Sequence, residues 1–545
     1  MSKNALIRGT IILTIAALIT RVMGVAQRIP LQRILEDEGM ATYGIAYNIY
    51  GILLIIATVG IPSALSKQIA EYHALGQFHE AQQTYQASRT FSIFAGVAAA
   101  VLLYAAAPFY AIHISHDPEA ILAIRAIAPA LLLFPLISIM RGYFQGLQFM
   151  SPTGLSQISE QFLRVGVAVI LPLYLLSVGF SREVAVAGAS FGAVAGSFGA
   201  IAVMIYFTYK TKQKREEEQR AQAKYETLSR NQIYRKLLKT AIPISLASTA
   251  IPFIYFIDSS TVISLLKPSM GFEEAKATLG ILVGRAQALA AIPPILAIAL
   301  SSAVLPAVAS AYSNKDLKQV SQMGSLSLRL TLLTGAPLAL YLTAAAFAVN
   351  GFLFGDIEGS WVVAALCFGS IFQMLMMTSM AILQGLGKTT LPMWHVFAAI
   401  VVKGLLNIVL APWIGIYGVI LATTISFLII LFLNLRAIQQ LVPLQILSER
   451  WRGFLWSSVA LVASVWPIYM GLEAWITIDW PVFVRYGLIC LATALVGFPV
   501  YFGLLLLLGG MNAEDLSFLP GRVRKILGRV LRKKEQELEK KVNDL

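Results

Sequence analysis

The sequence predicts an all-α polytopic membrane protein with about fourteen transmembrane helices. Three observations lead to this fold class. Of the 545 residues, 57% are hydrophobic and only 13% are charged, and the mean hydropathy of +0.73 is far above that of soluble globular proteins. The apolar residues form blocks of about 18 to 25, the length that a helix needs to cross a hydrocarbon core. An internal repeat also relates two parts of the chain.

The first six apolar runs are expected to form an N-terminal lobe over residues 1–209. The first run resembles a signal sequence, but it continues past a convincing cleavage point and is expected to be retained. The six runs cover residues 6–25, 43–62, 90–112, 121–144, 162–177 and 184–209.

A polar, basic linker over residues 210–240 interrupts this pattern before a second set of six runs, which we expect to form a C-terminal lobe over 241–435. A final helix pair over 453–508 and a basic tail over 509–545 complete the chain. The runs of the second set cover residues 241–265, 281–308, 328–353, 361–386, 393–413 and 416–435.

The internal repeat is visible at the ends of the fourth and tenth runs. Gln145-Gly146-Leu147, followed by Pro152, recurs as Gln384-Gly385-Leu386, followed by Pro392. The two tripeptides are 239 residues apart. Because each copy has an even number of spans, both copies enter the membrane from the same side, and a binding site is expected where they meet. This organisation is typical of transporters.

The charge distribution predicts the orientation. The net charge is +14, and most basic residues lie in the linker, the tail and the loops on one side, whereas acidic clusters such as Glu36-Asp37-Glu38 lie on the other. The positive-inside rule therefore places both termini in the cytoplasm. The basic loops are expected to contact anionic membrane lipids, and nucleic acid is not an expected partner.

Arginines inside the spans are candidate binding residues, because a charge in the membrane interior normally faces a cavity or a partner. Arg21 and Arg28 lie seven residues apart on one face of the first helix, although Arg28 precedes Pro30 and could equally be a boundary anchor. Arg285 precedes a Pro293-Pro294 break in the eighth span. A cavity with these arginines would suit an anionic group such as a diphosphate.

Other charged residues allow different interpretations. Asp258 in the seventh span needs a cation, a proton or a basic partner, and Lys403 in the eleventh, one turn before Asn407, needs a carboxylate on a neighbouring helix. Arg141 and Arg164 lie near span ends, where their stems are expected to reach lipid headgroups.

Enzyme signatures are mostly absent from the sequence. It lacks HExxH and a strand-bound glycine fingerprint, and Gly387-Lys388-Thr389 is not part of a phosphate-binding loop, because Ile382 replaces the first glycine. Cys367 and Cys490 lie in apolar runs without a metal-site spacing. We therefore expect no catalysis and no cofactor, with transport driven by ions, membrane potential or the substrate gradient.

The chain resembles the MOP exporter superfamily, and within it the branch of MurJ-like lipid II flippases and SpoVB-type polysaccharide exporters. The most specific matches are Thr20–Gly24, and Arg141–Gly146 leading to Pro152 and Glu160-Gln161. The resemblance implies two six-helix lobes around a central cavity, alternating access, and a groove for a polyprenyl tail in the final helix pair. It also implies location in a bacterial plasma membrane.

The resemblance assigns roles to single residues. Arg21 and Arg285 match cavity arginines of MurJ-like proteins, but Leu54 stands where a second-span arginine is found and Gln27-Arg28 replaces a basic-acidic pair. Some members bind sodium through residues whose positions here are held by Asp258, Lys403, Asn407 and Thr423. Lys403 in place of a neutral ligand leads to the hypothesis that its ammonium makes sodium unnecessary.

The leading functional hypothesis is a flippase that moves undecaprenyl-diphosphate-linked lipid II to the outer leaflet for cell-wall synthesis and cell shape, with cell-wall synthesis proteins as further partners. The first alternative is a flippase for another lipid-linked polysaccharide unit. A cation-coupled drug antiporter would show an acid-dominated cavity. A scaffold or a membrane glycosyltransferase would need a partner domain or paired catalytic carboxylates, for which the Glu36–Glu38 cluster is a weak candidate.

Overall fold

The computed structural model describes residues 3–58, 60–222, 227–476 and 480–511, and this part of the chain contains helices and turns but no strand. Twelve helical runs within it are long and apolar enough to cross a membrane. The first of these, Ile15–Ala74, is 60 residues long and bends at Glu36, so it is long enough for two crossings. The predicted all-α polytopic class is confirmed.

The predicted eighth span corresponds to a series of shorter elements. Helix α11 (Phe272–Gly280) continues into a π-helical segment, Ile281–Ala286, and then into the short helix α12 (Gln287–Ala290). The helix is interrupted before α13 (Pro294–Ser313), as the Pro293-Pro294 pair predicts, because proline removes a backbone donor. With this series and the two arms of the bent first run, the described helices account for about fourteen crossings.

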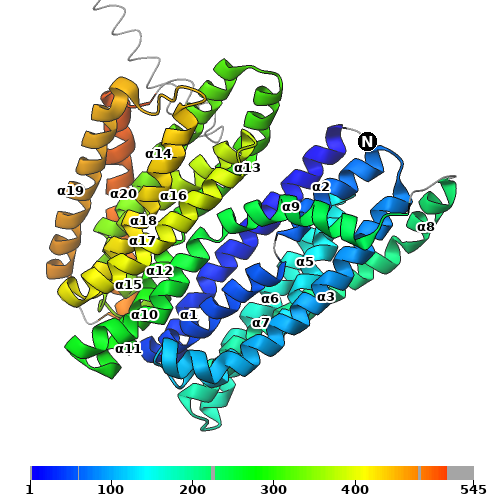
Figure 1. The fold of residues 1–545 in the computed structure, drawn as a ribbon. Coiled ribbons are helices and arrows are strands. Elements are labelled where there is room, and N and C mark those ends of the chain that lie inside the picture. Colours follow the sequence, from blue (N-terminus) through cyan, green and yellow to red (C-terminus); the bar gives the residue numbers. More distant parts are fainter. Residues whose placement is uncertain (1–2, 59, 223–226, 477–479, 512–545) are drawn as a thin grey trace, which may run out of the picture. The chain divides into compact units, whose positions relative to one another are not determined.

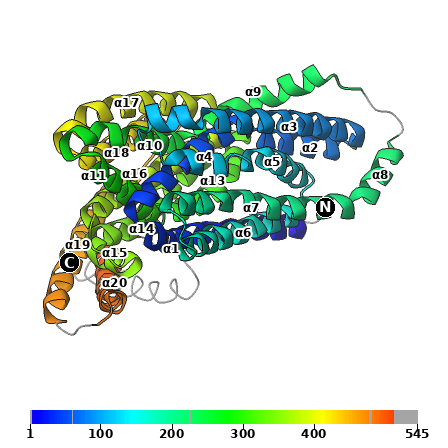
Figure 2. The ribbon, with the colours of Figure 1, turned by 90° about the horizontal axis from the view of Figure 1, so that it is seen from below.

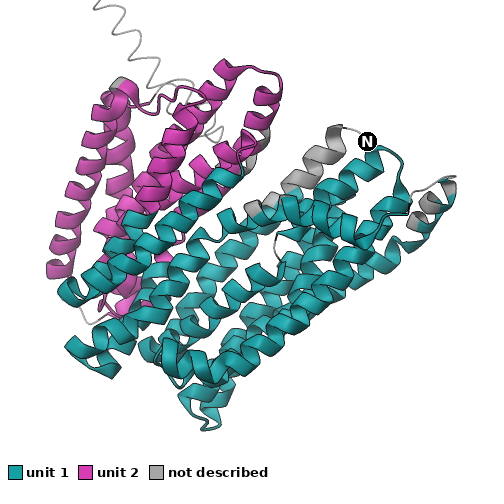
Figure 3. Ribbon diagram, viewed as in Figure 1, with its two compact units in different colours: residues 1–288, 389–426 teal, residues 289–388, 427–545 magenta. Residues whose placement is uncertain are grey.

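The helices form two compact units, coloured separately in Figure 3. Unit 1 comprises residues 1–288 and 389–426, and unit 2 comprises 289–388 and 427–545. Helices of both repeat copies occur in unit 1, because α10 (Ala250–Met270) packs on both α17 (Thr390–Ile414) and α1 (Lys3–Thr58). The units therefore do not coincide with the lobes 1–209 and 241–435, and the division into lobes stays a prediction. The tail beyond residue 511 lies outside the described residues.

Unit 1 contains the helices that carry most of the predicted site (Figure 1). Figures 1 and 2 both show α9 running beside α2 and α3. The predicted linker is partly helical, since α8 and the start of α9 lie within it. The helices are α1 (Lys3–Thr58), α2 (Ile61–Ala74), α3 (Phe78–Phe109), α4 (Ala120–Ile127), α5 (Ala130–Gly146), α6 (Ser151–Ser177), α7 (Arg182–Lys210), α8 (Lys212–Ala221), α9 (Arg230–Ser248), α10 (Ala250–Met270), α11 and α17 (Thr390–Ile414).

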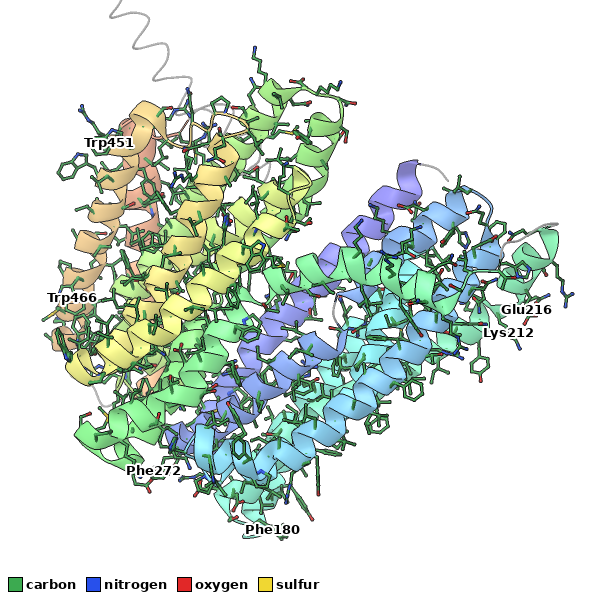
Figure 4. The ribbon with its side chains drawn as sticks, in the orientation of Figure 1. Phe180, Lys212, Glu216, Phe272, Trp451 and Trp466 are labelled. Atoms are coloured by element: carbon green, nitrogen blue, oxygen red, sulfur yellow. The ribbon has the colours of Figure 1, made fainter. Side chains whose placement is uncertain are left out.

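Unit 2 contains α13 and the C-terminal helix pair, α19 and α20, which pack on one another. The Tyr341 hydroxyl of α14 donates to the Cys490 carbonyl of α20 over 2.8 Å. On α19, Trp451 and Trp466 are labelled in Figure 4. The remaining helices are α14 (Leu317–Ala344), α15 (Ala346–Phe354), α16 (Ser360–Gly385), α19 (Trp451–Trp475) and α20 (Val482–Leu507), while α18 (Ile416–Gln439) continues from unit 1 into unit 2.

The bend in α1 is a strained backbone position. Glu36 has φ 59° and ψ −174°, a conformation that residues other than glycine rarely adopt. The bend is held by Arg182 at the start of α7, which forms ion pairs with Glu36 and with Glu38, the latter over 2.6 Å. Phe180, just before α7, and Lys212, just after it, mark the two ends of that helix in Figure 4. The acidic cluster therefore attaches the bend of α1 to the start of α7.

The internal repeat is also present in the packing. A Cβ on Gly146, the last residue of α5, would lie 2.8 Å from the Ser66 carbonyl oxygen of α2. A Cβ on Gly385, the last residue of α16, would lie 3.0 Å from the Leu305 carbonyl oxygen of α13. Both the glycines and their carbonyl partners are 239 residues apart. Each unit therefore contains one copy of the same helix contact.

The contact between α1 and α11 also requires a glycine. A Cβ on Gly280 would lie 1.7 Å from the Asp37 carbonyl oxygen, so we expect Gly280→Ala to lower the free energy of unfolding by about 1–3 kcal/mol through overpacking. Thermal unfolding of the purified protein in detergent measures this change. Gly51→Ala is the control, because a Cβ there meets nothing within 4 Å and should be neutral or stabilising. Equal stability of the two variants would contradict the contact.

Candidate functional site

A buried ion pair joins three helices of unit 1. The Lys403 Nζ on α17 lies 2.6 Å from the Asp258 Oδ1 on α10. It also donates to the Asn407 Oδ1 and to the Val419 carbonyl oxygen of α18, each over 2.8 Å. An ammonium has three hydrogens to donate, so these three acceptors satisfy it completely. Lys403 is 0% exposed and Asp258 is 2% exposed.

The remaining polar atoms of this network are also paired. Asn407 Nδ2 donates to Asp258 Oδ1 over 3.1 Å and to the Thr261 hydroxyl over 3.2 Å. The Thr423 hydroxyl donates to the second carboxylate oxygen of Asp258 over 3.4 Å. The structure therefore brings together all four residues predicted for an ion pair or coupling site. Of the partners open to Asp258, the structure supplies the basic one, and Lys403 meets a carboxylate on a neighbouring helix. A role of these residues in transport stays a prediction.

A sodium ion does not fit this arrangement. The oxygens of Asp258, Asn407 and Val419 are ligands that a hard cation prefers. The Lys403 ammonium already contacts all three, and two positive charges would repel each other strongly in a dry interior. These residues hold an internal cation instead of a metal ion.

The predicted binding arginines fall into two groups. Arg285 lies in the π-helical segment and donates to both carboxylate oxygens of Asp37, over 3.1 and 2.8 Å. Arg28 donates to the Val283 carbonyl oxygen of the same segment, so the structure brings Arg28 and Arg285 to one place. Arg21 is exposed, and no carboxylate among the described residues contacts it.

The expectation that Arg141 and Arg164 reach lipid headgroups is wrong. Both bind the Glu160 carboxylate of α6, Arg141 over 2.8 Å and Arg164 over 2.5 Å. Arg164 also donates to the Tyr47 hydroxyl of α1 over 3.2 Å, and its guanidinium lies over the Phe134 ring. A carboxylate in reach is a better partner than a distant headgroup. The spacing of Glu160 and Arg164, four residues apart, was a visible signal of this pair.

The repeat relates two of these cations. Arg164 and Lys403 are 239 residues apart, and each is thirteen residues beyond the start of its helix. Their partners differ, since Arg164 binds an acid on its own helix whereas Lys403 binds one on a neighbouring helix. Each copy therefore carries one basic residue at an equivalent position, with a different mode of neutralisation.

Comparison with known proteins gives the family. A family model described as "Polysaccharide biosynthesis protein" matches residues 6–312. The uncharacterized membrane protein YabM of Bacillus subtilis is 30% identical over 534 residues, which are 97% of this chain and 97% of YabM. The chain belongs to the polysaccharide biosynthesis protein family. The lipid II flippase MurJ of Bacillus subtilis is 27% identical over 450 residues, which are 78% of this chain and 81% of MurJ.

The solved structures agree with this family. A structure of lipid II flippase MurJ in the inward closed conformation has a TM-score of 0.64 at 14% identity and covers 90% of this chain and 99% of that chain. At this identity the likeness shows the fold. Taken together, the comparisons make this member of the polysaccharide biosynthesis protein family a multi-pass flippase or exporter of the MOP superfamily and not an enzyme.

The buried pair makes a prediction for stability. Lys403→Met leaves the Asp258 carboxylate without its cation, and we expect it to lower the free energy of unfolding by about 3–5 kcal/mol. The double variant Asp258→Leu with Lys403→Met removes both charges and should recover most of that loss. Thermal unfolding in detergent measures all three proteins. Lys388→Met, at an exposed position, is the control. A double variant as unstable as the single one would contradict the charge argument.

Proposed function

We propose that this protein is a flippase that moves lipid II, an undecaprenyl-diphosphate-linked peptidoglycan precursor, from the inner to the outer leaflet by alternating access. Its termini lie in the cytoplasm in this proposal, as the positive-inside rule predicts. The relative MurJ, which is described as a lipid II flippase, supports the choice of substrate. The observation that carries the proposal is an excess of positive charge inside the helices of unit 1.

Six basic side chains described above and the three carboxylates that contact some of them make up this charge balance. Glu160 is shared by two guanidinium groups, and neither Arg21 nor Arg28 contacts a carboxylate among the described residues. Three positive charges of this set are therefore not neutralised. The basic residues are Arg21, Arg28, Arg141, Arg164, Arg285 and Lys403, and the carboxylates are Asp37, Glu160 and Asp258.

Uncompensated guanidinium groups in a membrane protein favour an anionic substrate. A guanidinium binds phosphate oxygens through two parallel hydrogen bonds, and a diphosphate offers several such oxygens. Arg21 and Arg28 are the substrate-binding candidates that this balance favours, while Arg285 would have to exchange Asp37 for substrate. A drug-cation antiporter is disfavoured, because Asp258, the acid that such a substrate would need, is already bound by Lys403.

A flippase for another lipid-linked polysaccharide unit is the second candidate. The family description names polysaccharide biosynthesis, and the relative YabM, which is 30% identical, carries no substrate in its name. The charge balance fits this candidate equally well, since a diphosphate linkage is common to such lipids. The sugar distinguishes the two candidates.

Depletion in the host should trap lipid II in the inner leaflet if lipid II is the substrate. We expect wild-type protein and the control Arg220→Ala, at an exposed position on α8, to restore export, and Arg21→Ala and Arg28→Ala to fail, because they lose a phosphate contact. Labelling of lipid II from outside the cell measures export. Normal lipid II export after depletion, together with retention of another glycan lipid, would assign the second candidate instead.

The Lys403 ammonium acts as a tethered cation, and transport is therefore expected to proceed without sodium. Three oxygens contact this ammonium, and no further cation is needed to neutralise Asp258. Lys403→Asn removes the cation and supplies a neutral oxygen, so this variant should gain a requirement for sodium. Asp258→Asn should not depend on sodium, because no acid remains.

Transport in proteoliposomes, with sodium replaced by choline, measures this dependence. The wild type and the control Lys388→Asn should flip labelled substrate equally fast in both salts, and Lys403→Asn should be about tenfold or more slower in choline, a change of at least about 1.4 kcal/mol. A wild-type protein that stops without sodium would overturn the tethered-cation proposal and would leave the substrate assignment untouched.

A further inference from the structure

A polar cavity lies between α3 and α9, away from the ion pairs described above. Its volume is about 520 Å³, a size within the usual range for sites that hold small molecules. Its polar lining includes two arginines from different helices, Arg89 and Arg230. The other polar lining residues are Gln83, Gln86, Thr90 and Thr227. No carboxylate among the described residues lines it, so the cavity is positively charged.

An apolar core and two hydrogen bonds hold together the segments that line the cavity. Ala87 and Ile233 of its lining belong to the apolar core that joins α2, α3, α5, α7 and α9. The Tyr234 hydroxyl of α9 donates to the Ala87 carbonyl oxygen over 3.1 Å. The Leu228 backbone nitrogen donates to the Gln83 side chain over 2.8 Å. These contacts fix the spacing of the two segments from which Arg89 and Arg230 extend.

An apolar surface adjoins the cavity on α3. Ile93, Val97 and Val101 follow Thr90 at helical spacing, and they are 43%, 46% and 61% exposed. In a membrane protein an exposed apolar face along a spanning helix contacts lipid tails. The cavity therefore lies where a polar headgroup would be if the acyl chains of the same lipid covered this face.

We propose that the cavity between α3 and α9 binds the phosphate group of an anionic membrane phospholipid, with Arg89 and Arg230 as its two ligands. A guanidinium fork matches two phosphate oxygens, and two forks from different helices can hold one phosphate. Gln86, Thr90 and Thr227 offer hydrogen bonds to the rest of the headgroup. The bound lipid links α9, the first helix of the second repeat copy, to α3. None of its lining residues is among the substrate-binding candidates Arg21, Arg28 and Arg285.

Native mass spectrometry of the full-length protein in detergent tests this site, with phosphatidylglycerol and phosphatidylcholine of equal chain length as probes. We expect the wild type to retain phosphatidylglycerol in preference to phosphatidylcholine. The double variant Arg89→Gln with Arg230→Gln should bind phosphatidylglycerol about tenfold more weakly. The control Arg220→Gln with Arg235→Gln removes the same charge from exposed positions outside the cavity and should bind normally.

Two further measurements decide the source of the phosphate and guard against misfolded variants. Inorganic phosphate should not displace the lipid, because it lacks the chains that cover α3, and efficient displacement would overturn the lipid assignment. A photoreactive phosphatidylglycerol analogue should label wild-type residues 83–90 or 227–233, which needs no variant. Labelling elsewhere, equal retention of both lipids, or equal loss in the control variant would each overturn the proposal.

Discussion

The buried pair of Lys403 and Asp258 is the interaction on which the centre of unit 1 depends. A charge in a dry interior is tolerated only when it is paired and fully hydrogen-bonded, and here one ammonium meets a carboxylate, an amide and a backbone carbonyl at once. Those acceptors come from α10, α17 and α18, so the electrostatic requirement of a single side chain fixes three helices. The same requirement explains why α10 and α17 share a unit although they are distant in sequence.

The bend at Glu36 applies the same rule at the end of a helix. Asp37 takes up the charge of Arg285, while its two acidic neighbours take up the charge of Arg182. Three consecutive acids therefore join α1 to α7 and to the π-helical segment. The close approach at Gly280 brings the two backbones near enough for the Asp37 pair to form. A strained residue persists because these contacts determine its conformation.

Much of this structure could be predicted from the sequence, for reasons that differ between features. Span lengths, the break at Pro293-Pro294 and the need of Asp258 for a cation, a proton or a basic partner follow from local chemistry. The pairs of Arg141 with Glu160 and of Arg285 with Asp37 could not be derived in the same way, because their partners depend on which helices meet. The composition of the two units also depends on tertiary packing, and no local pattern in the sequence encodes it.

Arg164 and Lys403 occupy equivalent positions of the repeat but carry different kinds of basic group. An arginine keeps its charge at any accessible pH, whereas a lysine can lose its proton when its surroundings change. One half of the repeat carries a guanidinium at this position, and the other half carries an ammonium. The two related halves of the scaffold are therefore chemically unequal at equivalent positions.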